Sequence, residues 1–203
     1  MERSTDFFRF NDKERYGAVA ISFHWLVALS VYGMFGLGLW MRSLGYYDSW
    51  YRLGPWWHKG IGVMLFLLLL LRLVWRFSNT QPDHLPNHKP YERLAAVGVH
   101  VLLYLLLFTV MISGYLISTA DGRSLEVFDW FVVPATISGF DHQEDIAGKV
   151  HLYLAWSVVV LSGLHALAAL KHHFIDHDQT LLRMFGASGS TADSRFKSKS
   201  TSK

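Results

Sequence analysis

Four long apolar stretches dominate this sequence and constrain its fold more than any other feature. They cover roughly residues 17–41, 55–76, 94–118 and 147–171, and no acidic residue lies inside any of them. A helix needs about 20 mostly apolar residues to cross the hydrocarbon core of a bilayer, so each stretch is long enough to span it. The connections between them are polar and rich in turn-forming residues. We therefore expect an all-α integral membrane protein that folds as a four-helix bundle.

The remaining residues form two segments outside the bundle. Residues 1–16 mix both charge signs and lack the features of a cleavable signal peptide, so we expect a cytoplasmic N-terminal segment. Residues 17–174 form the transmembrane domain. Residues 175–203 form a cytoplasmic tail whose end is rich in Ser, Lys and Gly and is predicted to be largely disordered.

The distribution of Lys and Arg predicts the orientation in the membrane. Of the 19 basic residues, fourteen lie in the N-terminal segment, in the connection near residues 72–93 or in the tail, and five lie at the opposite ends of the helices. By the positive-inside rule both termini are cytoplasmic, and the first and third connections face outward. We expect a multi-pass membrane protein surrounded by the lipid bilayer.

Composition excludes several classes of function. The chain has no cysteine, which rules out disulfides, thiolate metal sites, covalently attached haem and Cys-ligated iron–sulfur clusters as intrinsic features. The net charge of +3 is too small, and the basic residues too scattered, to indicate nucleic-acid binding. Any metal or cofactor must therefore be held by histidine, methionine or carboxylate.

Eleven histidines are the candidate ligands, and depth in the membrane separates them. Those in the connections or the tail are interpreted as solvated surface residues: His84, His88, His142 and His177. His172 and His173 lie at the cytoplasmic end of the fourth helix. Five lie inside the predicted spans, where ionisable groups are candidates for function: His24, His58, His100, His151 and His165.

The five intramembrane histidines form two sets. His58 and His151 both lie about one turn below the outer surface. His24 and His165 lie about 10 and 9 Å from the inner side, and His100 falls at a similar depth. His151 and His165 are fourteen residues apart, a step that returns to within about 40° of the same helix face and advances about 21 Å.

Two sites with two neutral imidazoles each indicate bis-histidyl b-type haem, because a planar macrocycle supplies the other iron ligands. Zinc would require more protein ligands per site, and no Asp, Glu or Cys lies near enough to supply them. Depth alone selects His58 and His151 as the histidines of the outer site. For the inner site, His24 and His100 both remain candidates to pair with His165.

Several fragments resemble the prokaryotic cytochrome b561 family of dihaem membrane cytochromes. They are "AISFHWLVAL", "WHKGIGVML", "GVHVLLYLLLF" followed by "ISGYLISTADG", and "VHLYLAWSVVVLSGLHALAALKHHFIDHDQTLLRM". The resemblance covers about residues 14–185. It implies two non-covalent b haems, with His58 and His151 as axial ligands of the outer haem iron and His24 and His165 as those of the inner one.

The same resemblance leaves supporting roles for four other residues. His100 becomes a residue that contacts the inner ligands or a haem propionate. Arg72 and Arg76 are candidate partners of the inner propionates, and Lys59 of the outer ones. For both arginines the alternative is that the side chain reaches the membrane interface instead.

The resemblance implies a location in the bacterial inner membrane. It also implies electron transfer, in which membrane quinol is oxidised and electrons pass through the haems to an acceptor. The enzyme class is then a quinol-linked oxidoreductase. One alternative is a cytochrome b anchor and electron conduit for a separate dehydrogenase or hydrogenase, and a more distant one is a haem-free transporter. The expected partners are membrane quinone or quinol and a periplasmic or membrane redox protein, and a homodimer is compatible with the same interpretation.

Overall fold

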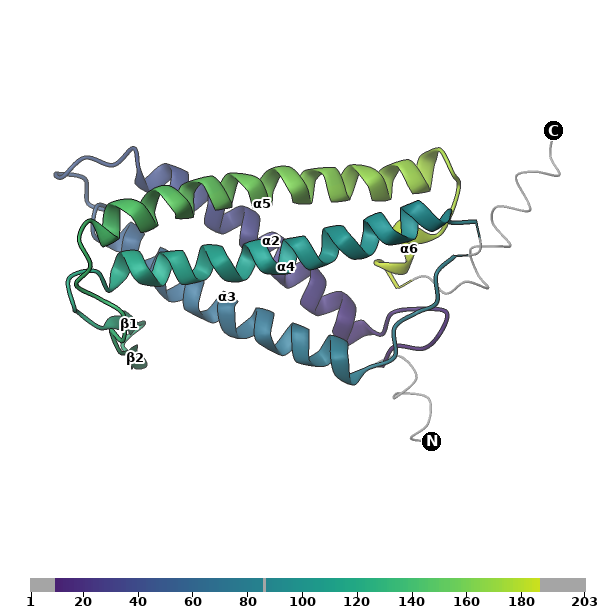
Figure 1. Cartoon of the computed structure of the whole chain (residues 1–203), viewed down its shortest axis with the longest axis horizontal. Helices are drawn as coiled ribbons and strands as arrows, with labels where there is room; N and C mark the ends of the chain where they lie inside the picture. Colours follow the sequence, from purple (N-terminus) through teal and green to yellow (C-terminus); the bar gives the residue numbers. More distant parts are fainter. Residues whose placement is uncertain (1–9, 86, 187–203) are drawn as a thin grey trace. The chain divides into compact units, whose positions relative to one another are not determined.

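The computed structural model describes residues 10–85 and 87–186 (Figure 1). The first nine residues of the predicted N-terminal segment and residues 187–203 of the predicted tail lie outside this range. Four long helices account for most of the described chain: α2 (Ala18–Met41), α3 (Leu53–Ser78), α4 (Pro90–Ser118) and α5 (Gln143–Phe174). All four are long and apolar enough to cross a membrane. The prediction of an all-α membrane protein with four spanning helices is confirmed.

Local sequence explains where two of these helices begin. α4 begins at Pro90, whose fixed φ suits the first helical position. The Glu92 side chain accepts a hydrogen bond of 3.0 Å from the backbone N–H of Lys89, which is the return contact of a capping box. α5 has Glu144 and Asp145 in its first turn and Lys171 in its last turn, and these charges complement the helix dipole at both ends.

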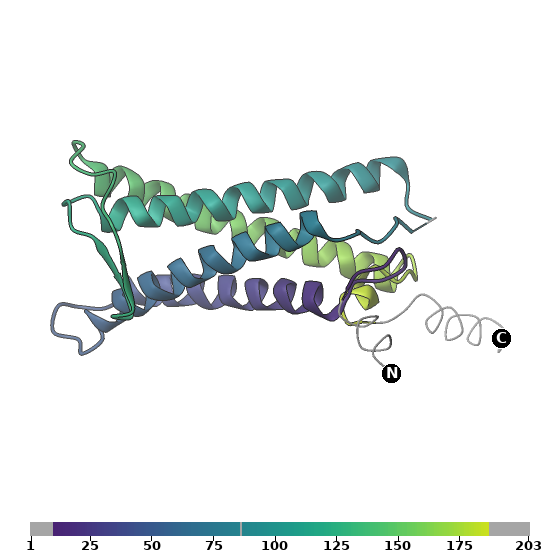
Figure 2. The same ribbon diagram turned by 90° about the horizontal axis from the view of Figure 1, so that it is seen from below.

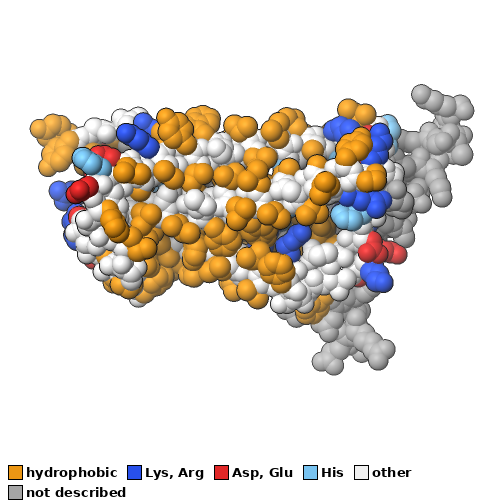
Figure 3. Space-filling model, viewed as in Figure 1, with side chains coloured by type: hydrophobic (Ala, Val, Ile, Leu, Met, Phe, Trp, Pro, Cys, Tyr) orange, Lys and Arg blue, Asp and Glu red, His pale blue; other side chains and the backbone are white. Residues whose placement is uncertain are grey.

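The surfaces of the helices are apolar, as a bilayer requires. Leu29, Val74 and Leu164 expose 67%, 62% and 57% of their surface, and many other large hydrophobic side chains are similarly exposed. Figure 3 shows hydrophobic side chains spread along the helices on the face that is in view. A soluble protein rarely exposes so much contiguous apolar surface. These side chains therefore face lipid.

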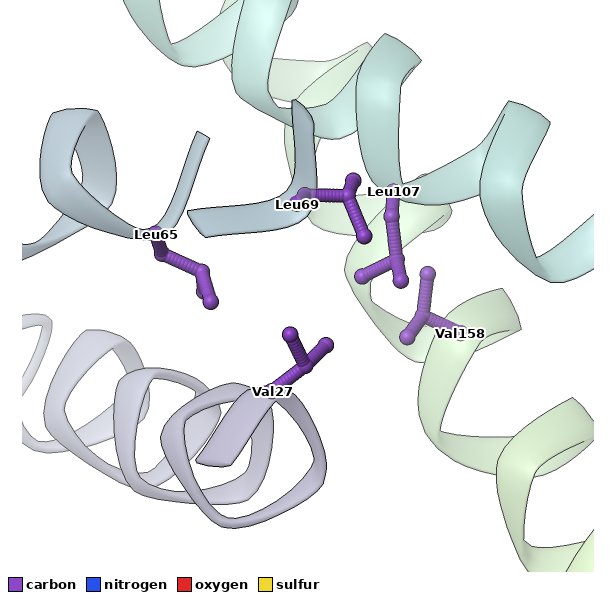
Figure 4. Packing of buried hydrophobic residues seen from close by; sticks show 5 residues of the cluster. All are labelled: Val27, Leu65, Leu69, Leu107 and Val158. Carbon is purple, nitrogen blue, oxygen red and sulfur yellow. The ribbon is translucent and has the colours of Figure 1, made fainter. Parts of the chain in front are cut away.

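Contacts divide the chain into two compact units, and a segment of every long helix belongs to each. Among the described residues, the first unit contains 10–26, 70–85, 87–99 and 163–186, and the second contains 27–69 and 100–162. The second unit has a small buried core to which all four helices contribute (Figure 4). Its fully or nearly fully buried members are Val27 of α2, Leu65 and Leu69 of α3, Leu107 of α4 and Val158 of α5.

A small hairpin forms within the connection between α4 and α5 (Figure 2). Strand β1 (Leu125–Val127) pairs antiparallel with β2 (Phe131–Val133). The turn between them is closed by a hydrogen bond from the Trp130 N–H to the Val127 carbonyl, and Phe128 and Asp129 both have positive φ, as a type I′ turn requires. The remaining element, the short helix α6 (Thr180–Arg183), follows α5.

Candidate haem-binding sites

His58 on α3 and His151 on α5 lie together in the second unit. Their ring centres are 6.1 Å apart and their planes are inclined by 70°. Both side chains are half-buried. The two histidines that were predicted to share the outer site are therefore neighbours.

The hydrogen bonding of His151 leaves one ring nitrogen available to a metal. Its Nδ1 lies 2.8 Å from the carbonyl oxygen of Val110, which can only accept, so Nδ1–H is the donor. Nε2 then carries the free lone pair. A backbone carbonyl that fixes the tautomer in this way is the usual support of a metal-ligating histidine.

A cavity of about 910 Å³ opens beside this pair. Its lining is almost entirely apolar and includes both histidines. The charged residues that line it are all basic: Arg42, Lys59 and Lys149. A large apolar pocket with cations among its lining residues suits a flat, apolar ligand that carries carboxylates.

Two glycines allow helix backbones to approach the two imidazoles. A Cβ atom at Gly38 of α2 would lie 3.2 Å from Cε1 of His58, and one at Gly114 of α4 would lie 3.2 Å from Cε1 of His151. Both glycines also line the cavity. Each imidazole therefore rests against a backbone that has no side chain at the point of contact.

The inner pair lies in the first unit. The ring centres of His24 on α2 and His165 on α5 are 6.4 Å apart, with planes inclined by 64°. Arg72 of α3 contacts one of the two rings, because its Nη2 donates to Nδ1 of His24 at 2.9 Å. This contact fixes Nδ1 as the acceptor, so the proton of a neutral His24 ring is on Nε2.

The other residues singled out from the sequence are placed as follows. His100 is half-buried on α4 and belongs to the second unit. Arg76 is half-buried on α3, one turn after Arg72. Lys59 is exposed and lines both the large cavity and a smaller polar pocket of about 440 Å³.

Both histidine pairs have the spacing that haem iron requires. Two metal–nitrogen bonds of about 2 Å, together with the distance from each nitrogen to its ring centre, place the ring centres about 6 Å apart. The separations of 6.1 and 6.4 Å agree with this value. The residues present therefore fit two bis-histidyl centres.

Several features of the site are not apparent from the sequence. No local pattern in the sequence marks Gly38 or Gly114 as part of the site, because glycine is common in membrane helices. The role of each glycine depends on a histidine of another helix. Arg42 and Lys149 were counted only as indicators of orientation, yet both line the cavity. Gly60 leaves room for the Phe128 ring of the hairpin, since a Cβ atom at Gly60 would lie only 2.5 Å from Cζ of Phe128.

Comparison with known proteins gives a consistent result. The family model described as prokaryotic cytochrome b561 matches residues 15–187. Cytochrome b561 homolog 2 of Escherichia coli K12 is 56% identical over 180 residues, which is 89% of this chain and 96% of that protein. A probable superoxide oxidase, CybB of Yersinia pestis, is 33% identical over 176 residues, covering 84% and 96% of the two chains.

Four apolar spanning helices, paired intramembrane histidines and a family match over most of the sequence agree with one another. The family implies haem b and electron transfer within a bacterial membrane. This chain belongs to the prokaryotic cytochrome b561 family of membrane proteins.

Proposed function

We propose that the protein binds two b haems non-covalently, one between His58 and His151 and the other between His24 and His165. The observation that carries this proposal is the separation of about 6 Å within each pair, which suits one iron between two imidazoles. The Nδ1–H bond from His151 to Val110 and the apolar cavity beside the outer pair add support.

When bound, haem b supplies a one-electron redox centre. Two histidines on each iron would leave no free position at which dioxygen could bind. The apolar side chains around the outer pair keep water away, and Arg42, Lys59 and Lys149 supply positive charge for the propionates. These features would suit electron transfer and would disfavour binding of dioxygen at the iron.

Arg72 would have to give up its contact with Nδ1 of His24 if that ring held the inner haem through Nε2. That nitrogen needs a free lone pair, so Nδ1 must carry the ring proton and can no longer accept from Arg72. The released guanidinium would then pair with a propionate, with Arg76 one turn further along α3.

The function we infer is oxidation of membrane quinol, with electrons passing through the two centres to an acceptor. Each quinol that is oxidised to quinone releases two electrons and two protons. The bilayer location of the four helices supports a lipid-soluble donor. We place the protein in the inner membrane with both termini in the cytoplasm, because fourteen of the 19 basic residues lie on that side.

A second candidate runs electrons in the opposite direction, from superoxide to quinone. One relative is named a probable superoxide oxidase, and the three cations that line the outer cavity would attract an anionic substrate. In this reaction two superoxide ions and two protons react with one quinone and yield two dioxygen molecules and one quinol.

Two assays on purified, haem-loaded protein distinguish the two directions of electron flow. Quinol oxidation is measured as reduction of a one-electron acceptor after addition of a quinol analogue. Superoxide oxidation is measured as quinol formation from quinone during steady generation of superoxide. Lys59→Gln and Arg42→Gln should slow the superoxide reaction, and Arg52→Gln, which does not line the cavity, should not. Protein that does neither alone but co-purifies with a soluble redox subunit would be a conduit, and the proposal would fail.

A further inference from the structure

A cluster of histidines and carboxylates lies in the first unit, where the chain enters α4 and where α5 ends. His88 precedes α4 by two residues, His172 is in the last turn of α5, and Asp176 and Asp178 follow it. The candidate haem ligands do not contribute to this cluster among the described residues. Its chemistry is therefore independent of the function proposed above.

The polar atoms of the cluster converge on one point. One ligand atom each of His88, His172 and Asp178 lies within 4.8 Å of the other two. Oδ2 of Asp178 is 2.9 Å from Nε2 of His88 and 3.1 Å from Nδ1 of His172. The two imidazole rings are also close, with centres 4.7 Å apart.

These side chains are largely removed from solvent. The exposed fraction is 4% for the Asp178 side chain, 15% for His88 and 14% for His172. Among the tail and connection histidines, His84, His142 and His177 are exposed, whereas His88 is not. The prediction that His88 is a solvated surface residue is therefore wrong. A carboxylate this deeply buried needs compensating charge or coordination.

Hydrogen bonds explain only part of the arrangement. His88 and Asp178 form one, but Nδ1 of His172 is buried and has no hydrogen-bond partner in the part of the chain that the structure describes. This nitrogen nevertheless lies 2.7 Å from Oδ2 of Asp176 and 3.1 Å from Oδ2 of Asp178. A buried imidazole nitrogen that faces a carboxylate oxygen without a hydrogen bond to it can serve as a metal ligand.

The two oxygens of Asp178 have separate contacts. Oδ1 accepts a hydrogen bond of 2.8 Å from the backbone N–H of Thr180, which fixes the carboxylate. Oδ2 faces the two imidazoles. One oxygen thus orients the group and the other is available as a ligand, which is the arrangement found around protein metal ions.

We propose that His88, His172 and Asp178 bind a divalent transition-metal ion of the zinc class. Asp176 is not one of the proposed ligands, because its Oδ2 accepts a hydrogen bond of 2.6 Å from Nζ of Lys171. Two imidazoles and a carboxylate suit Zn²⁺, whereas Ca²⁺ and Mg²⁺ prefer sites made only of oxygen. The ion would join the connection before α4 to the end of α5. Residues 88 and 178 are 90 apart in sequence, so it would link two distant parts of the chain.

The first experiment measures zinc in the full-length, haem-loaded protein, purified with a tag that contains no histidine. After chelator treatment and zinc titration against a competing chelator, mass spectrometry counts zinc and iron separately. We expect about one zinc per chain. His88→Gln and Asp178→Asn should weaken binding at least about 100-fold, and His84→Gln, an exposed histidine of the same connection, should bind as the wild type does.

Asp178→Asn keeps an oxygen for the Thr180 N–H, and an unchanged b-type spectrum in each variant shows that the protein is folded. X-ray absorption at the zinc edge then examines the wild type without interference from haem iron. It should find two imidazole nitrogens at about 2.0–2.1 Å. No zinc binding, equal binding by all variants, or a zinc environment without imidazole would each overturn the proposal.

Discussion

Gly114 is a single residue on which the outer site depends. A Cβ atom there would lie 3.2 Å from Cε1 and 3.3 Å from Nδ1 of His151, closer than neighbouring atoms normally approach. The same Nδ1 donates to Val110 at 2.8 Å, so the ring cannot withdraw without straining that bond. The absence of a side chain at Gly114 therefore positions the His151 imidazole.

We predict that Gly114→Ala destabilises the protein by roughly 1–3 kcal/mol, the usual cost of overpacking, and that Gly114→Leu removes one of the two haems. Gly33→Ala is the control, because a Cβ atom at Gly33 has nothing within 4 Å. Thermal unfolding in detergent and haem content per chain measure the two effects. Equal stability of the Gly114 and Gly33 alanine variants would show that His151 tolerates the extra methyl group.

The hairpin contacts α3 through one aromatic side chain, Phe128. The Phe128 ring packs against Trp56 and Trp57 of α3, with ring centres 5.0 and 5.3 Å apart. It also covers Gly60, where a Cβ atom would lie only 2.5 Å from the Phe128 Cζ. Because His58 lies between Trp57 and Gly60 on α3, the hairpin is attached next to a candidate haem ligand.

Gly60→Ala should detach the hairpin at a cost of roughly 1–3 kcal/mol in the free energy of unfolding. The double variant Gly60→Ala with Phe128→Ala should recover the part of this loss that comes from the clash, since the smaller side chain leaves room for the methyl group. A double-mutant cycle of thermal unfolding measures the coupling. If the effects of the two changes simply add, Phe128 does not press on Gly60 in solution.

At the scale of the whole molecule, the four helices could be predicted from the sequence, because each is marked by a continuous apolar stretch of its own. Apolar length alone determines a membrane span, and the described helices overlap all four predicted stretches. Pairings between helices were harder to foresee. His58 with His151 followed from depth, but Phe128 over Gly60 and His88 beside Asp178 depend on contacts between distant residues, for which one sequence offers no local pattern.

The orientation of the whole molecule is testable because the chain has no cysteine of its own. His142→Cys lies in the connection predicted to face outward, and His84→Cys in the one predicted to face the cytoplasm. A membrane-impermeant maleimide should label the first variant in intact spheroplasts and the second only after lysis. Labelling in the reverse pattern would invert the topology.

The central claim is that each histidine pair holds one haem, and haem content per chain tests it most directly. Pyridine haemochrome analysis should find about two b haems in the wild type, with b-type α-bands in the reduced-minus-oxidised spectrum. His58→Ala and His151→Ala should each retain about one, because both remove a ligand of the same centre. His142→Ala, an exposed histidine, should retain about two. Two haems in the His58 and His151 variants, or a single haem in the wild type, would contradict the account.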